Sequence, residues 1–332
     1  GKPLDQARLE VIRGCEFLEW DAGEATRTYG RVIPSAPGVR YIVHHQPIGT
    51  VAAFSPWNFP MRPPFRTVAG AIAAGCSIIL KAAEETPAGA LHIARAFQDA
   101  GLPRGVLNLV FGTPSEISDH LIKQDQVRLV AFTGSTETAR LINLSLAGRD
   151  APFATLIAET GGQNVMIVDS SALPEQVSDD VMTSAFSSAG QRCSALRVLY
   201  VQDSIADKVI KMLKGALAER QIGDPLDLST DIGPVINVSS RTGLEQNIDR
   251  MHKEAKLIGR AKVPDGLENG SYLAPHIFEI PCLATLKDEE FGPVLHVIRY
   301  APRDINKVMA EIGDTGFGLT FGIHSRIEGY WL

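Results

Sequence analysis

The chain has few cysteines and no sequence signature of a disulfide framework or a metal centre. Its four cysteines are scattered along 332 residues, and none belongs to a Cys-x-x-Cys pair. Such cysteine usage favours the reducing cytosol as the compartment. His44 and His45 are adjacent, so on a strand their side chains face opposite ways, and no other His, Cys or carboxylate cluster has zinc-like spacing. We therefore expect no metal site and interpret these imidazoles as surface groups.

Long apolar segments and an excess of basic charge are also missing. No apolar run approaches the roughly eighteen residues of a membrane-spanning helix, and the opening segment GKPLDQARLE contains no apolar signal core. The formal net charge is -6, whereas nucleic-acid binding favours a basic patch. These absences predict a cytoplasmic protein that neither inserts into a membrane nor binds nucleic acid.

The length and composition are those of a globular protein with two domains. Hydrophobic residues make up 45% and charged residues 21% of the chain, which is ordinary for this class. Because single cores rarely exceed about 250–300 residues, a chain of 332 residues favours two domains. The chain has no initiating Met and stops abruptly at Leu332, so we interpret it as a fragment.

Strand and helix patterns alternate along most of the chain. A helical pattern at 4–21 and an extended ribbon at 29–46 come first. Strand patterns at 50–54, 77–80, 106–111 and 128–132 then alternate with helix patterns at 66–74, 88–100, 115–123 and 136–146. A second series has strands at 164–168 and 197–202 and helices at 174–188, 204–220 and 239–254. This alternation predicts parallel sheets with crossover helices, and we place the domain boundary near Ile157 and Ala158.

Cys193 is the first candidate for chemistry. It lies in SSAGQRCSA, between a predicted helix and a predicted strand, beside the cation of Arg192. A nearby positive charge favours the thiolate, which is the reactive form of the side chain. Free cysteines are also among the most buried residues, and Cys76 in AAGCSIIL fits that structural role. Composition alone leaves Cys193 open between nucleophile and core filler.

Two further polar residues stand where the backbone is constrained. Glu159 lies at a strand end, shortly before Gly161 and Gly162, where the backbone can bend and come close to another part of the protein or to a ligand. Taken alone, however, a Glu beside glycines is more often a solvated loop charge. Asn58 lies in SPWNFP, and an amide fixed between prolines and aromatics is a suitable donor to an oxyanion. Taken alone, that segment is better explained as a rigid, packed turn.

In their order along the chain, these segments resemble the aldehyde dehydrogenase superfamily. SPWNFP, the Lys-containing strand, FTGST, ETGG, the GQRC loop and EFGPV follow one another as in that family, over essentially the whole chain. The resemblance implies an α/β fold with a Rossmann-type NAD-binding domain at 1–158 and an α/β catalytic domain at 159–332. It also implies that 29–46 is part of an oligomerisation β-ribbon.

A covalent mechanism is a further implication of the resemblance. The Cys193 thiolate would attack the aldehyde carbon to give a thiohemiacetal, whose oxyanion is held by the Asn58 side chain and the Cys193 backbone N–H. Hydride transfer to the nicotinamide would then leave a thioester. Glu159 would deprotonate the water that hydrolyses this thioester to the carboxylic acid.

Cofactor binding is predicted at FTGST rather than at a GxGxxG fingerprint, which the chain lacks. A strand that turns into a helix at Gly134 and Ser135 offers free N–H groups to a diphosphate, although many helices simply begin this way. By resemblance Lys81 and Glu84 bind the adenosine ribose and Trp57 contacts the cofactor. The alternative is that Lys81 and Glu84 are exposed charges at a strand end. A carboxylate at the ribose repels a 2′-phosphate, so Glu84 favours NAD, with NADP as the alternative.

The EEFGP segment resembles the family's nicotinamide-ribose clamp. Glu289 would bind the ribose hydroxyls, and Phe291 would pack beside the nicotinamide. Position 290 is usually apolar in this motif, whereas here it is a second acid, Glu290. This departure leaves the geometry of the clamp open.

Two branches of the family indicate the aldehyde. The segment 49–111 resembles broad-specificity and succinate-semialdehyde-type members. From about Phe132 onward, SAFSSAGQRCSALRVLYVQ and FGPVLHVIRY resemble the glutamate-semialdehyde dehydrogenase half of the bifunctional proline-utilisation enzyme. The chain is then a recombinant of two relatives or a natural member with mixed features. Because the catalytic half lines the aldehyde tunnel, we expect L-glutamate γ-semialdehyde, with succinate semialdehyde or a range of aliphatic aldehydes as the alternative.

Substrate binding and assembly follow from the same resemblance. Ser194 would hydrogen-bond the substrate carboxylate, with Arg192 as a second substrate-binding residue, although Ser194 alternatively just starts a strand. The family's Gly-rich anchor loop and C-terminal oligomerisation strand would lie beyond Leu332. We therefore expect homo-oligomers of the whole protein and weak activity of this chain. The alternative outside the enzymes is a catalytically inactive remnant that binds a nucleotide or a partner protein. The retention of Cys193, Glu159 and Asn58 argues against this alternative.

Overall fold

The computed structural model of the chain describes residues 1–330, without the side chains at positions 114, 115, 118, 119 and 330. The chain forms two compact units. The first, here called the N-terminal unit, comprises Arg8–Thr160. The second, the C-terminal unit, comprises Gly1–Ala7 and the chain from Gly161 onward. The first seven residues therefore pack with a part of the chain that lies far away in sequence.

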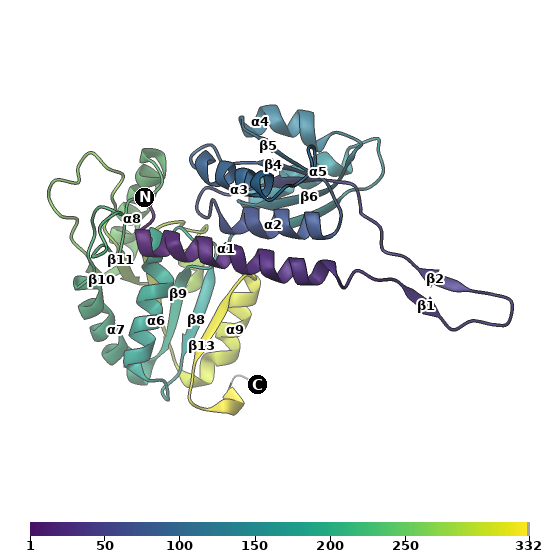
Figure 1. Ribbon diagram of the computed structural model, residues 1–332. Coiled ribbons are helices and arrows are strands. Elements are labelled where there is room, and N and C mark those ends of the chain that lie inside the picture. Colours follow the sequence, from purple (N-terminus) through teal and green to yellow (C-terminus); the bar gives the residue numbers. More distant parts are fainter. Residues whose placement is uncertain (331–332) are drawn as a thin grey trace. The chain divides into compact units, whose positions relative to one another are not determined.

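A parallel sheet of five strands forms the centre of the N-terminal unit (Figure 1). Its strands, in chain order, are β3 (Thr50–Phe54), β4 (Ile78–Lys81), β5 (Leu107–Val110), β6 (Val127–Thr133) and β7 (Thr155–Glu159). Their order across the sheet is β5-β4-β3-β6-β7. The chain therefore starts at the central strand, builds one half of the sheet, and then returns to build the other half from β6.

Helices connect these strands, as the alternating pattern predicts. They are α2 (Arg62–Ala73), α3 (Pro87–Asp99), α4 (Pro114–Ile117) with a π-helical turn (Ser118–Ile122), and α5 (Thr136–Ala147). Helix α1 (Leu4–Ala25), which begins in the C-terminal unit, precedes the sheet in the chain. Successive residues of β3 point to opposite faces of the sheet. Val51 and Ala53 pack in one apolar cluster, and Ala52 packs in another. Both faces of the sheet are thus buried, as expected of a parallel sheet with crossover helices.

A two-stranded antiparallel ribbon of β1 (Arg31–Ile33) and β2 (Tyr41–Val43) also belongs to the N-terminal unit. Figure 1 shows it extending away from the five-stranded sheet. All six strand residues are exposed, and the ribbon carries exposed Val32 and Tyr41. The ribbon expected at 29–46 is therefore present, with strands of only three residues each.

The C-terminal unit is built on a second, mixed sheet of six strands. These are β8 (Asn164–Val168), β9 (Leu196–Gln202), β10 (Lys256–Arg260), β11 (His276–Glu279), β12 (Val294–Tyr300) and β13 (Phe321–His324), in the order β10-β11-β12-β9-β8-β13. Only the pairing of β10 with β11 is antiparallel among these strands. Every residue of the central strand β9 is buried.

Four α-helices and four short 3₁₀ segments complete the described part of this unit. The α-helices are α6 (Pro174–Phe186), α7 (Asp203–Ala218), α8 (Val238–Glu254) and α9 (Ile305–Asp314), and the 3₁₀ segments are Ser187–Gly190, Leu283–Thr285, Pro302–Asp304 and Glu328–Tyr330. One large apolar cluster joins the sheet to α6, α7 and α8. The expectation of an α/β fold is confirmed. Within residues 1–330, no helix combines the length and apolar character needed to cross a membrane.

Most of the elements delimited from the sequence are observed within a few residues of their predicted limits, whereas β7, β10 to β13 and α9 were not delimited. The expected helix at 115–123 is α4 followed by a π-helical turn. The expected helix at 174–188 ends at Phe186, because the next residues leave helical geometry. Strand β7 was not delimited from the sequence, since its residues are exposed or only half-buried and lack an apolar alternation.

Glu10 of α1 is a buried acid that supports the start of α2. Its exposed fraction is 5%, and its Oε1 accepts hydrogen bonds from the backbone N–H of Met61 at 2.8 Å and of Arg62 at 3.1 Å. The N-cap of α2, Met61, makes no side-chain capping bond of its own. Glu10 thus takes the role of a capping residue from another helix, at the point where the SPWNFP segment enters α2.

We predict that Glu10→Ala lowers the free energy of unfolding of the N-terminal unit by about 1–3 kcal/mol, because two backbone donors lose their partner. Glu10→Gln, which keeps an acceptor oxygen, should lose less. Urea unfolding followed by circular dichroism measures both. Glu16→Ala, at an exposed position of the same helix, is the matched control. A Glu10→Ala variant as stable as Glu16→Ala would contradict the capping role.

Candidate active site

The candidate cofactor residues of the N-terminal unit gather at one edge of its sheet. Trp57 and Asn58 follow β3, Lys81 ends β4 with Glu84 three residues later, Gly134 and Ser135 follow β6, and Glu159 ends β7. Carboxyl ends of parallel strands meet at the same edge. The strand order places β3 beside β6, where the direction of winding reverses. Such switch points are where open α/β sheets bind their ligands.

The turn from β6 into α5 has the features of an anion-binding site. Gly134 donates its N–H to the carbonyl of Glu159 at 3.0 Å, and a Cβ at this position would lie 2.5 Å from Phe132 Cζ, so a larger residue would push the Phe132 ring aside. Ser135 is the N-cap of the twelve-residue α5, and its hydroxyl accepts a hydrogen bond from the Thr138 N–H at 3.2 Å. The positive end of the helix dipole and the first amides of α5 suit a diphosphate.

Lys81 and Glu84 form an ion pair at the carboxyl end of β4. Lys81 Nζ lies 3.0 Å from Glu84 Oε1, and the two side chains are 8% and 48% exposed. The alternative of two exposed strand-end charges therefore fails for Lys81, which is buried. Glu84 keeps a carboxylate at the surface, oriented by a buried cation.

In the C-terminal unit, the loop that carries Cys193 begins with an unusual turn. Ser188 and Ala189 have φ values of 54° and 53°, and Gly190 follows at 67°. Left-handed backbone is rare for residues with a Cβ and persists where the surroundings impose it. A Cβ at Gly190 would also collide with the carbonyl oxygen of Gly292. The turn reverses the chain between α6 and β9, and Cys193 itself is half-buried.

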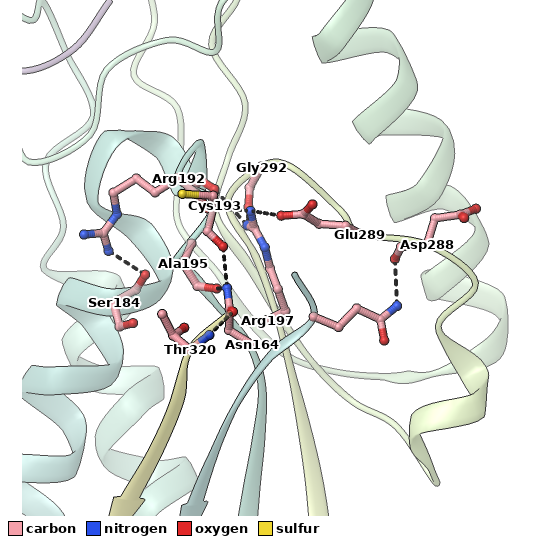
Figure 2. Close-up of polar contacts among 12 residues, drawn as sticks. Asn164, Ser184, Arg192, Cys193, Ala195, Arg197, Asp288, Glu289, Gly292 and Thr320 are labelled. Atoms are coloured by element: carbon pink, nitrogen blue, oxygen red, sulfur yellow. Dashed lines mark hydrogen bonds and ion pairs between the residues drawn. The ribbon is translucent and has the colours of Figure 1, made fainter. Parts of the chain in front are cut away.

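Asn164 fixes the backbone on both sides of the cysteine (Figure 2). Its Nδ2 donates to the carbonyl oxygens of Cys193 at 2.6 Å and Ala195 at 2.8 Å. Its Oδ1 accepts from the N–H of Thr320 at 3.1 Å. Since Asn164 is 3% exposed, this amide is a rigid part of the core.

Arg197 connects the cysteine loop to the segment 288–293, here called the clamp loop. The Arg197 side chain is 2% exposed. Nη1 donates to the carbonyls of Gly190 at 2.8 Å and Gly292 at 3.1 Å, and Nη2 donates to the carbonyl of Arg192 at 3.1 Å. Nη2 also lies 3.3 Å from Glu289 Oε1 (Figure 2). One buried cation thus ties together two loops that are about ninety residues apart in sequence.

The two clamp residues named from the sequence both lie against Arg197. Burial raises the pKa of Glu289, opposed by Arg197 and by a hydrogen bond from the backbone of Gly162. The Glu289 carboxylate lies against the Cα of Gly161, where a Cβ would displace it. The guanidinium carbon of Arg197 stands 5.3 Å from the centre of the Phe291 ring. Glu289 and Phe291 are therefore held in place from inside the protein.

Glu290, the acid at a position that is usually apolar, is largely buried. The pKa of Glu290 is raised to about 7, chiefly by burial; the charge of Arg250 opposes this rise, the charge of Asp288 adds to it, and the charge of Arg197 opposes it. Its neighbour in the loop, Gly292, packs against Leu244 of α8 so tightly that a Cβ would collide with that side chain. The clamp loop thus lies between Arg197 and α8.

The predicted substrate residues beside Cys193 have different environments. Arg192 Nη2 donates to the carbonyls of Thr183 at 2.8 Å and Ser184 at 2.7 Å, in the last turn of α6. Burial lowers the pKa of Arg192, opposed by the charge of Cys193. The charge interaction with the cysteine exists, but the guanidinium is directed at a helix end. Ser194 is exposed, and the substrate-binding roles of both residues stay predictions.

The site residues thus fall into two groups. The C-terminal unit brings together Cys193, Arg192, Ser194, Glu289 and Phe291. The N-terminal unit carries Asn58, Trp57, Lys81, Glu84, Gly134, Ser135 and Glu159. Within residues 1–330, no group of three or more His, Cys, Asp or Glu side chains has the arrangement of a metal site.

Sequence reasoning missed Arg197 and Asn164, which hold the cysteine loop. Arg197 could have been recognised because it is a cation near the start of the apolar strand LRVLYVQ. A charge buried in such a strand requires polar partners, which predicts a structural role. Asn164 offered only an amide at the start of another apolar strand.

We predict that Arg197→Met lowers the free energy of unfolding of the C-terminal unit by about 3–5 kcal/mol, because it leaves the Glu289 carboxylate buried without its cation. Adding Glu289→Gln should restore part of this loss. Denaturant unfolding of both variants and of Arg303→Met, at an exposed position of the same unit, makes the comparison. A loss below about 1 kcal/mol in Arg197→Met would show that the guanidinium holds neither loop.

Comparisons with known proteins agree with this architecture. The family model described as "Aldehyde dehydrogenase family" matches residues 1–330. The bifunctional protein PutA of Escherichia coli is 42% identical over 99% of this chain and 25% of its own length. The NADP(+) succinate-semialdehyde dehydrogenase GabD of E. coli is 36% identical over 98% of this chain and 67% of its own. A crystal structure of a Bradyrhizobium japonicum proline utilization A variant matches with a TM-score of 0.95 and 44% identity, over 100% of this chain and 34% of that one. The chain thus spans about a quarter of the length of the bifunctional relative.

Proposed function

The chain belongs to the aldehyde dehydrogenase family, and from that membership we propose that it oxidises an aldehyde to a carboxylic acid with Cys193 as the nucleophile. The observation that carries the proposal is the cysteine loop. A half-buried thiol follows a left-handed turn, and a buried amide and a buried guanidinium fix the backbone around it. Such support is typical of a side chain that must be positioned for chemistry.

In this proposal the chain's own residues perform the covalent steps. The Cys193 thiolate adds to the aldehyde carbon, and the charge of Arg192 favours the thiolate. The Asn58 amide and the Cys193 backbone N–H donate to the oxyanion. Loss of hydride turns the thiohemiacetal into a thioester. Glu159 takes the proton of the water that releases the acid, which returns Cys193 to its free form.

A nicotinamide dinucleotide fits the residues at the carboxyl edge of the five-stranded sheet. The glycine at position 134 and the first amides of α5 would hold the diphosphate, Lys81 and Glu84 the adenosine ribose, and Trp57 the adjoining part of the cofactor. Glu289 and Phe291 would hold the nicotinamide end. When bound, the cofactor supplies the hydride acceptor. We propose NAD rather than NADP, because the surface carboxylate of Glu84 would repel a 2′-phosphate.

L-Glutamate γ-semialdehyde is the proposed substrate, and L-glutamate the product, as in proline catabolism. The support is the 42% identity to a bifunctional PutA protein, against 36% to a succinate-semialdehyde dehydrogenase. Ser194, exposed beside the nucleophile, would bind the substrate carboxylate together with Arg192. Succinate semialdehyde is the second candidate, because the relative named for it matches over two thirds of its length.

We further propose that the whole protein is a homo-oligomer in the cytoplasm. The exposed apolar residues of the β1–β2 ribbon suit burial against another copy of the chain. Cys15, Cys76 and Cys282 are free thiols, which suits a reducing compartment.

The test is NADH formation, followed by its absorbance, with glutamate γ-semialdehyde, succinate semialdehyde and propanal in parallel. We expect the highest kcat/KM with glutamate γ-semialdehyde, and a loss of at least about a thousandfold in Cys193→Ala, as for removal of a catalytic nucleophile. Cys15→Ala, at an exposed thiol, is the matched control. A preference for succinate semialdehyde would keep the chemistry and replace the substrate. Full activity in Cys193→Ala, or no activity of the folded chain with any aldehyde, would refute the proposal.

A further inference from the structure

The left-handed turn before Cys193 is held from a distant part of the chain. Gln6 lies in the segment Gly1–Ala7, which packs within the C-terminal unit. Its Oε1 accepts hydrogen bonds from the backbone N–H and the hydroxyl of Ser188, both at 2.8 Å. Ser188 is 182 residues away in sequence and is the first residue of the turn with positive φ.

This segment is itself anchored, so Gln6 can act as a fixed point. The N–H of Leu4 donates to the carbonyl of Pro225 at 2.9 Å, and Gln6 Nε2 lies 3.4 Å from the carbonyl of Asp231. The side-chain amide of Gln6 therefore has both ends engaged, and its carbonyl faces the turn.

The remaining polar groups of Ser188 point into the same loop. Its carbonyl accepts from the backbone N–H of Gln191 at 3.0 Å and from Gln191 Nε2 at 3.2 Å. Gln191 Oε1 in turn accepts from the N–H of Ile236 at 2.8 Å. Ser188 is thus bonded at its N–H, hydroxyl and carbonyl, and Gln6 supplies the partner of the first two.

The conformation needs this support because two of its residues carry a Cβ. Ser188 and Ala189 are buried, with exposed fractions of 8% and 1%, and neither is a glycine that would adopt positive φ without strain. Cys193 follows the turn by only three residues, so a relaxed turn would move the thiol.

We propose that Gln6 is a positioning residue for the nucleophile: its side-chain carbonyl holds the left-handed turn, and the turn holds Cys193. The catalytic part of this inference rests on the proposed aldehyde oxidation, whereas the structural part stands without it. Gln6 touches neither the thiol nor any reacting atom. Its removal therefore alters how well Cys193 is placed and leaves cofactor binding unchanged.

Three single variants and one double variant separate positioning from general stability. Gln6→Met keeps the side-chain length and removes the acceptor, whereas Gln6→Glu keeps an oxygen at the same place. Gln176→Met, at an exposed position of α6 in the same unit, is the matched control. The rescue variant combines Gln6→Met with Ala189→Gly, because glycine adopts the left-handed conformation without a Cβ penalty.

The first measurement is hydrogen–deuterium exchange of the peptide covering 186–196, with peptides from β9 and β12 as reporters of global unfolding. We expect Gln6→Met to speed exchange in 186–196 by about tenfold, as for the loss of a buried hydrogen bond, and to leave β9 and β12 unchanged. Gln176→Met should exchange like the parent chain. Gln6→Glu keeps the acceptor for Ser188 but loses the donor to the Asp231 carbonyl, so it should exchange more slowly than Gln6→Met. Unchanged exchange in Gln6→Met overturns the proposal, and so does an increase shared equally by β9 and β12.

The second measurement is the split between kcat and KM. Gln6→Met should lower kcat by about tenfold, as expected when a reacting group is misplaced, with the KM for NAD within about twofold. Addition of Ala189→Gly should restore most of kcat. A kcat lowered in Gln6→Met and not raised by Ala189→Gly overturns the proposal. If the parent chain oxidises no aldehyde, the proposed function has failed, and the exchange measurement still decides whether Gln6 holds the turn.

Discussion

A buried guanidinium needs hydrogen-bond acceptors, and this requirement shapes the C-terminal unit. The Nη1 and Nη2 atoms of Arg197 find them in three backbone carbonyls and in the carboxylate of Glu289, whereas its Nε has no partner among the described residues. Because an unpaired charge in the core costs several kcal/mol, the cysteine loop and the clamp loop have little freedom to move apart. Burial disfavours the charge on both Arg197 and Glu289, so the pair specifies geometry more than it adds stability. The half-buried thiol of Cys193 lies on the cysteine loop, which these contacts of Arg197 hold in place.

In the N-terminal unit, the topology of the sheet brings the candidate cofactor residues together. The chain starts at the central β3 and winds outward in both directions, which leaves the carboxyl ends of β3 and β6 side by side. Polar residues lie at or just after the carboxyl ends of β3, β4, β6 and β7, and the first amides of α5 suit a diphosphate. This edge is the proposed cofactor-binding site. Glu10 caps the start of α2, the helix that follows the segment containing Asn58.

Sequence reasoning could predict what depends on local pattern. The alternation of strands and helices, the ribbon and the order of the motifs follow from periodicity and from short segments such as FTGST and GQRC. The sequence placed Glu159 at a strand end but did not delimit strand β7, whose residues show no alternation of apolar and polar side chains. The turn at Ser188 and Ala189 was also missed, because nothing in Ser-Ser-Ala announces left-handed backbone. Gln6 and Arg197, which form hydrogen bonds to this turn, do so through contacts that exist only once the chain has folded. Hydrogen bonds between residues that lie far apart in the chain cannot be recognised from a local pattern in a single sequence.

The central claim is that Cys193 carries the aldehyde as a covalent intermediate. The most direct test is mass spectrometry of the Glu159→Gln variant after mixing with glutamate γ-semialdehyde and NAD, since loss of the general base should slow hydrolysis of the thioester. We predict a peptide containing Cys193 that carries the acyl mass, released by hydroxylamine, together with NADH in equal amount. Formation of NADH while the Cys193 peptide stays unmodified, or acylation of Cys15 or Cys282 instead, would contradict the account.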